Sequence, residues 1–159
     1  MIDDLALARA LHVLAVVHWI GGVAMVTWVI LPAVSRLAGP DRRLALFEAA
    51  EHRFGRQARW SVTLAGLSGF YLTHRLQAWD RFLEPAFWWM HAMVLVWALF
   101  TLVLFMAEPL VLHDWFHSRA GRDPDGTMAL VQRAHTVLAT LALITVAGAV
   151  LGAHGGLPW

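Results

Sequence analysis

Four long apolar segments, separated by polar links, dominate the chain. They run from about Leu5 to Val34, Trp60 to Trp79, Pro85 to Leu112 and Met128 to Ala153. A helix needs about 20 mostly apolar residues to cross a bilayer, and each segment reaches about that length. The pattern therefore predicts an all-α fold, an integral membrane four-helix bundle, with residues 1–159 forming a single transmembrane domain.

The polar links between these segments differ in length and character. The first, Ser35 to Arg59, carries the amphipathic pattern RRLALFEAAEHRFGRQARW, which predicts that the second helix extends into the headgroup region with its arginines snorkelling. The second link, HRLQAWDRFLEP, is short. The third, HDWFHSRAGRDPDG, contains the turn-forming residues Gly121, Pro124 and Gly126. The first and third predicted helices should therefore run in one direction and the second in the other.

The arginines are unequally distributed between the two sides of this arrangement. No lysine is present, so arginine supplies all 12 basic residues. Most of them lie in or beside the first and third links, and links on the cytoplasmic side are the ones enriched in basic residues. The sequence thus predicts a multi-pass protein of a bacterial-type inner (plasma) membrane, with the first and third links inside and both termini outside.

Composition supports contact with the lipid bilayer and removes other classes of function. Hydrophobic residues make up 59% of the chain and charged residues 14%, whereas a soluble domain is about half apolar and a quarter charged. The nine tryptophans suit a membrane interface. The absence of cysteine excludes disulfides and thiolate metal sites, and a net charge of +1 gives no case for nucleic acid as a partner. The acidic N-terminus is unlike a signal peptide, so the first apolar run is interpreted as a retained helix.

Nine histidines in so apolar a chain are the main chemical signal, because polar residues inside a membrane are costly and usually functional. His12 lies about seven residues into the first predicted helix and His91 about six into the third, so both should lie roughly 10 Å from the outer boundary. His74 lies near the outer end of the second helix. Three histidines from three helices should therefore meet at one level, as candidate ligands of a metal or a haem.

Two imidazoles on different helices can bind a haem iron if an apolar, aromatic slot surrounds it. Trp19 is expected to line this slot, and Arg9 and Arg75 are expected to pair with the haem propionates. Without cysteine for covalent attachment, the group would be haem b. Copper is the alternative cofactor, because imidazole and methionine ligands both suit it. For each single histidine, the competing interpretation is a hydrogen bond to a neighbouring helix.

A second candidate site lies toward the inner side. Glu108, near the inner end of the third predicted helix, and His135, in the inner half of the fourth, are predicted to form a polar pair that carries protons or binds a cation. The alternative for this pair is a buried hydrogen bond. His52, His113 and His117 are expected at the inner membrane interface.

Roughly the first two-thirds of the chain resembles a known superfamily. The segment LHVLAVVHWIGGVAMVTWVILP is similar to the first helix of the copper-resistance protein D family, with its Leu-His pair, Trp-x-Gly-Gly cluster and late proline. HemJ-type protoporphyrinogen oxidases show a similar start, with a tryptophan seven residues after the histidine, as in His12 and Trp19. FEAAEHRFGRQARWSVTLAGLSGFYLT resembles their second-helix region, and WWMHAM around His91 resembles their third-helix motif. The resemblance implies a four-helix membrane fold and, in the HemJ branch, haem b with His12 as a ligand.

Several functions are compatible with these features. The favoured one is electron transfer by a haem protein between an outer-side donor and a quinone or partner protein. The alternatives are a HemJ-like protoporphyrinogen oxidase, a copper-handling membrane protein and a purely structural membrane subunit. The sequence identifies neither the redox partner nor the oligomeric state, and a homo-oligomer is among the open alternatives.

Overall fold

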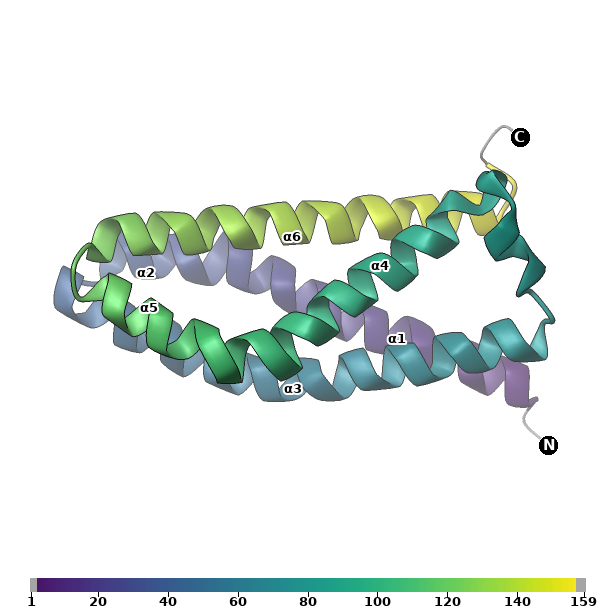
Figure 1. Cartoon of the computed structure of the whole chain (residues 1–159), viewed down its shortest axis with the longest axis horizontal. Coiled ribbons are helices and arrows are strands. Elements are labelled where there is room, and N and C mark those ends of the chain that lie inside the picture. The colour runs from purple at the N-terminus through teal and green to yellow at the C-terminus, as the bar shows by residue number, and fades with distance from the viewer. Residues whose placement is uncertain (1–2, 157–159) are drawn as a thin grey trace.

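The computed structural model describes residues 3–156, apart from the side chains of residues 40–41 and 109–113, and every regular element in that range is helical (Figure 1). The elements are α1 (Asp4–Met25), η1 (Val26–Ile30), α2 (Leu31–Leu37), α3 (Pro40–Arg75), η2 (Asp80–Leu83), η3 (Pro85–Phe87), α4 (Trp88–Leu102), η4 (Val103–Leu112), α5 (His113–Ala120) and α6 (Pro124–Ala153). The segments η1 and η4 are π-helical, whereas η2 and η3 are short 3-10 helices. The predicted all-α class is confirmed.

Local chemistry sets where the helices begin. Asp3 caps α1 by accepting a hydrogen bond from a backbone N–H two residues on (3.3 Å). Asp123 caps α6 in the same way by accepting from the Gly126 N–H (2.9 Å), and Pro124 follows in the first turn. Pro40 likewise opens α3, at a position where the missing N–H leaves no hydrogen bond unmade.

The helix α3 ends before the predicted boundary at Trp79. Gln77 takes a left-handed conformation with φ 51°. The Ala78 N–H then donates to the Thr73 carbonyl (3.0 Å), and the Gln77 N–H donates to the His74 carbonyl (3.1 Å). These two bonds form a Schellman motif, which satisfies the last carbonyls of the helix and turns the chain away.

Three helical stretches are long and apolar enough to cross a membrane, namely Asp4–Leu37, Pro85–Glu108 and Pro124–Ala153. They agree with the first, third and fourth predicted spans. The predicted second span lies in α3, which is absent from this group. Its N-terminal half is rich in charged residues, and the apolar stretch that follows is short because it ends at His74 and Arg75. Large apolar side chains cover the outside of the apolar helices, as for Leu14, which is 65% exposed, and Leu95, which is 69% exposed. A surface of this kind fits contact with lipid.

The long helices lie side by side, with both chain termini at one end, here called the terminus end, and the α2–α3 and α5–α6 turns at the other, the turn end (Figure 1). The helix α1 packs along α3, while α4 lies against α6 at the terminus end and crosses toward α3 farther on. Gly148 and Gly152 of α6 allow this approach, because they face the indoles of Trp88 and Trp89 and a Cβ at either position would collide with a ring.

Two clusters of buried side chains hold the helices together. The first is central and includes Trp19, Val62, Phe100 and Ala139, each from a different long helix. The second lies nearer the turn end and comprises Val26, Leu31, Phe47 and Met128. The central cluster separates two polar regions, one with His12 toward the terminus end and one with charged residues toward the turn end.

Candidate functional site

His12 lies on the buried face of α1, one turn from the buried residues Ala8 and Ala15 on either side. Its imidazole reaches across to α3. There, the Nδ1 atom lies 3.0 Å from the carbonyl oxygen of Ala65 and 3.1 Å from the Oγ atom of Ser68. The ring is therefore fixed to the neighbouring helix through one nitrogen.

The hydrogen bonds of His12 determine which ring nitrogen is free for a ligand. The Ser68 hydroxyl donates to the Leu64 carbonyl (2.5 Å), so its oxygen acts as an acceptor toward His12. With two acceptors beside it, Nδ1 carries the proton, and Nε2 keeps its lone pair. Metal-binding histidines use this arrangement, in which one nitrogen donates to a carbonyl and the other binds the metal. Gly69 makes room for the ring, because a Cβ there would lie 3.0 Å from the His12 Cε1 atom.

The structure places Trp97, rather than His91, at the level of His12 on α4. The Trp97 Nε1 donates to the Val62 carbonyl (2.9 Å), and the same indole faces Gly66, so Trp97 meets the part of α3 that His12 also contacts. His91 precedes Trp97 by six residues, which corresponds to about 9 Å along a helix. The predicted ligands therefore lie at different heights along the helices.

His91 and His74 are both exposed near the terminus end. The His91 Nε2 donates to the carbonyl oxygen of Phe82 in η2 (2.9 Å), and the two rings pack edge to face. His74 lies in the last turn of α3. Within the described residues, neither imidazole contacts His12, and no group of three or more histidine, aspartate or glutamate side chains is arranged to hold a metal ion.

The other residues of the predicted haem site have varied surroundings. Arg75 donates to the carboxylate of Asp4 (2.8 Å), which ties the ends of α3 and α1 together. Arg9 is exposed on α1. Trp19 is buried against the Phe100 ring at a centroid distance of 4.9 Å, and its Nε1 has no hydrogen-bond partner among the described residues.

A set of charged residues lies between α3 and the η4–α5 segment, toward the turn end. We call it the charged network, and it comprises Glu48, Glu51, Arg59, Glu108 and His117. In it, Arg59 forms an ion pair with Glu108 and also donates from Nε to the Leu104 carbonyl (3.1 Å). In a π-helix, the backbone N–H at position 109 would donate to the carbonyl of Leu104, five residues earlier. Pro109 has no N–H, so this hydrogen bond cannot form. Arg59 thus takes the place of the missing donor.

The remaining members of the charged network lie closer to the turn end. The His117 Nε2 lies 3.0 Å from the Glu48 Oε1. Glu51 lies one turn farther along α3 than Glu48. Burial, together with the nearby carboxylates of Glu108 and Glu48, raises the pKa of Glu51 from 4.5 to about 7.

Glu108 and His135, which were predicted to pair with each other, each contact a different partner. Glu108 binds Arg59. The His135 Nδ1 lies 3.0 Å from the Val131 carbonyl one turn earlier on α6, and its ring packs edge to face on Phe47 at 6.1 Å. Both residues lie in the half of the molecule near the turn end, but no bond between them is found in the described part of the chain.

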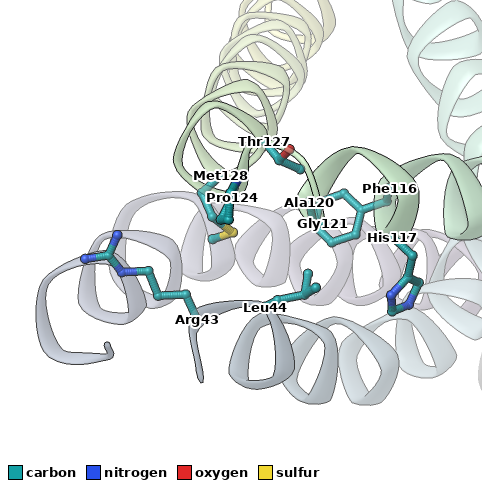
Figure 2. Close-up of a pocket in the computed structure, with 9 residues that line it drawn as sticks. All are labelled: Arg43, Leu44, Phe116, His117, Ala120, Gly121, Pro124, Thr127 and Met128. Atoms are coloured by element: carbon teal, nitrogen blue, oxygen red, sulfur yellow. The ribbon is translucent and has the colours of Figure 1, made fainter. Parts of the chain in front are cut away.

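A cavity of about 240 Å³ opens beside the charged network at the turn end (Figure 2). It lies between the start of α3 and the α5–α6 turn, and Figure 2 shows His117 extending from α5 toward α3 at its edge. Apolar side chains form much of the wall, and polar groups lie at the rim. Its lining includes Leu44 of α3 and His117 and Ala120 of α5.

Sequence reasoning identified Glu108 but missed Arg59, Glu48 and Glu51 as its neighbours. The spacing of Glu48 and Glu51, three residues apart, places both carboxylates on one face of a helix and was the available signal. The partner of that face depends on which helix packs there. His113, expected at the same interface, has a side chain outside the described residues.

The chain matches no family model, no curated protein and no solved structure.

Proposed function

We propose that the chain is a four-helix protein of a bacterial-type plasma membrane that binds haem b through His12 and transfers electrons between an outer-side donor and a quinone or partner protein. The observation that carries this proposal is the fixed imidazole of His12, which is held to α3 through Nδ1 and has Nε2 available on the buried side of α1. The resemblance of the first segment to the copper-resistance protein D and HemJ-type proteins supports the same choice of ligand.

The contacts between α3 and α1 support a fourth membrane span. Hydrogen bonds join the two helices at three levels, through the pairs Arg75–Asp4, Ala65–His12 and Ser61–His18. Because α1 is apolar enough to cross a bilayer, its pairing with α3 over this distance supports a crossing by α3 as well. The arginines of the turn end favour an inner location for that end, with both termini outside.

Small neighbours of His12 support a flat group held by its imidazole. Ala8 and Ala15, one turn to either side, are small, while the space at Gly69 on α3 accommodates the His12 ring itself. The indole N–H of Trp19 lies on the same face of α1, about two turns farther along, where it is buried against Phe100 and has no hydrogen-bond partner among the described residues. A haem bound here would supply one-electron chemistry. His91 and His74, both exposed near the terminus end, are the candidates that would supply a second histidine to the group.

An absorption spectrum of the purified protein, combined with metal analysis, tests the proposal. We expect a b-type spectrum from haem-sufficient cells, with the haem extractable into acidified organic solvent. His12→Ala should lose the haem or change its spin state, whereas His154→Ala, at the exposed end of α6, should leave the spectrum unchanged. Separate His91→Ala and His74→Ala spectra identify the second ligand, if the iron has one.

Three outcomes would overturn the assignment. A normal spectrum in a folded His12→Ala variant would remove His12 as a ligand. A protein that contains copper and no haem would make copper handling the function, and a protein with neither would be a structural subunit. Turnover of a porphyrinogen by the haem-loaded protein would replace electron transfer by the HemJ-like oxidase activity.

A further inference from the structure

The charged network contains more carboxylates than cations. His117 pairs with Glu48 at 3.0 Å, and Arg59 pairs with Glu108. Glu51, between these two pairs, has no cation of its own among the described residues, and it interacts unfavourably with both neighbouring carboxylates. When all three carboxyl groups are ionised, the network carries at least one uncompensated negative charge in a partly buried place.

A continuous face of α3 leads from the cavity to this charge. Leu44, Glu48, Glu51, Gly55 and Arg59 recur at three- and four-residue spacings, so they lie along one side of the helix over about 22 Å. Leu44 lines the cavity, and Arg59 lies at the far end. A Cβ built on Gly55 would meet no atom within 4 Å, so space remains between Glu51 and Arg59.

The cavity can bring water to the start of this face. Its volume of about 240 Å³ is far larger than the space that one water molecule needs. His117 lines the cavity and also pairs with Glu48, so one side chain links the open space to the first carboxylate of the series. The His117–Glu48 pair therefore joins the cavity wall to the charged network.

We propose that Glu51 is a proton-binding site, loaded from the turn end through the cavity and the His117–Glu48 pair. Loading transfers one proton from water to the Glu51 carboxylate, gives a neutral carboxylic acid and moves no electrons; release is the reverse. The carboxylates that act on Glu51 are Glu48 of α3 and Glu108 of η4, whose partners are His117 of α5 and Arg59 of α3, while His135 of α6 packs on Phe47 one turn away. The raised pKa of Glu51 agrees with proton exchange near neutral pH. The proposal does not depend on a haem.

Infrared difference spectroscopy of the full-length protein in lipid nanodiscs tests the site. We expect a protonated-carboxyl band that titrates with a midpoint near pH 7 and is lost in Glu51→Gln. Glu51→Asp should retain a titrating band, and Glu84→Gln, in an exposed link, should leave the wild-type band unchanged. In Arg59→Gln, the three carboxylates lose the Arg59 guanidinium as a counter-charge, so a second carboxyl should titrate in the neutral range. A band that persists in Glu51→Gln, or no neutral titration in the wild type, would overturn the site.

The loading route has its own test. Ala120 is buried in the cavity wall, so Ala120→Leu should fill the space and slow protonation after a pH jump, without moving the midpoint. An unchanged rate with a filled cavity would overturn the route, while the Glu51→Gln titration would still decide the site. Because none of these measurements uses haem absorption, failure here is distinguishable from failure of the haem assignment.

Discussion

Replacing Glu51 with glutamine should change the pH dependence of stability in a defined direction. The pKa of Glu51 is raised in the fold from 4.5 to about 7. Between these values the folded protein holds a proton that the unfolded chain has lost, so the free energy of unfolding falls as pH rises through this window. Below about pH 4.5, Glu51 is protonated in both the folded and the unfolded protein, so it does not lower the free energy of unfolding. Above about pH 7, Glu51 is ionised in both states, and the full cost of burying its charge lowers the free energy of unfolding.

The size of the effect follows from the same shift. One pKa unit corresponds to about 1.4 kcal/mol, so the rise from 4.5 to about 7 gives about 3.5 kcal/mol as an upper value. Partial exposure of Glu51 and screening by solvent reduce it, and about 1–2 kcal/mol is the expected loss. Glutamine has nearly the same shape and carries no charge, so Glu51→Gln should not show this loss.

Thermal unfolding in detergent, followed by tryptophan fluorescence over about pH 4 to 9, measures the difference. The Tm of the wild type should fall relative to that of Glu51→Gln between pH values of about 4.5 and 7, and the gap should then stay constant. Glu84→Gln, which removes an exposed carboxylate, should follow the wild type. Parallel curves for wild type and Glu51→Gln across the whole range would refute the reasoning.

Three further predictions concern packing, pairing and topology. Gly148→Ala should lower the free energy of unfolding by about 1–3 kcal/mol, because its Cβ would collide with the Trp88 indole of α4. The control Gly21→Ala, whose Cβ would meet no atom within 4 Å, should be neutral, and equal Tm values for the two variants would contradict the packing. Arg59→Met should destabilise more than the double variant with Glu108→Gln, because the single change leaves a carboxylate without its cation; additive Tm changes would argue against the pair. Because the chain has no cysteine, Ser118→Cys introduces a single thiol that reports the membrane topology. This thiol should react with an impermeant thiol reagent only from the inner side, and labelling from the outside would show that the orientation is the opposite of the predicted one.

Much of the helical structure follows from local sequence. Apolar runs of sufficient length predicted three helical stretches that the structure shows to be apolar and long enough for a membrane. Asp123 and Pro124 mark the start of α6 because a capping carboxylate and a proline each suit a helix N-terminus. The amphipathic link was correctly expected to continue the second helix, and α3 runs unbroken from Pro40 to Arg75. Its end before Trp79 was not predicted, because the left-handed turn occurs at Gln77 and not at a glycine.

The relative heights and partners of the polar side chains depended on the tertiary structure. Counting residues from assumed membrane boundaries put His12 and His91 at one depth, but helix tilt and packing place Trp97 opposite the level of His12. The same count paired Glu108 with His135, whereas the crossing of α3 and η4 brings Arg59 to Glu108 from 49 positions away in the chain. A periodic sequence determines which residues share a helix face, because that depends only on the helical repeat. It does not determine how far one helix slides along another, because that shift depends on how side chains from distant segments fit together.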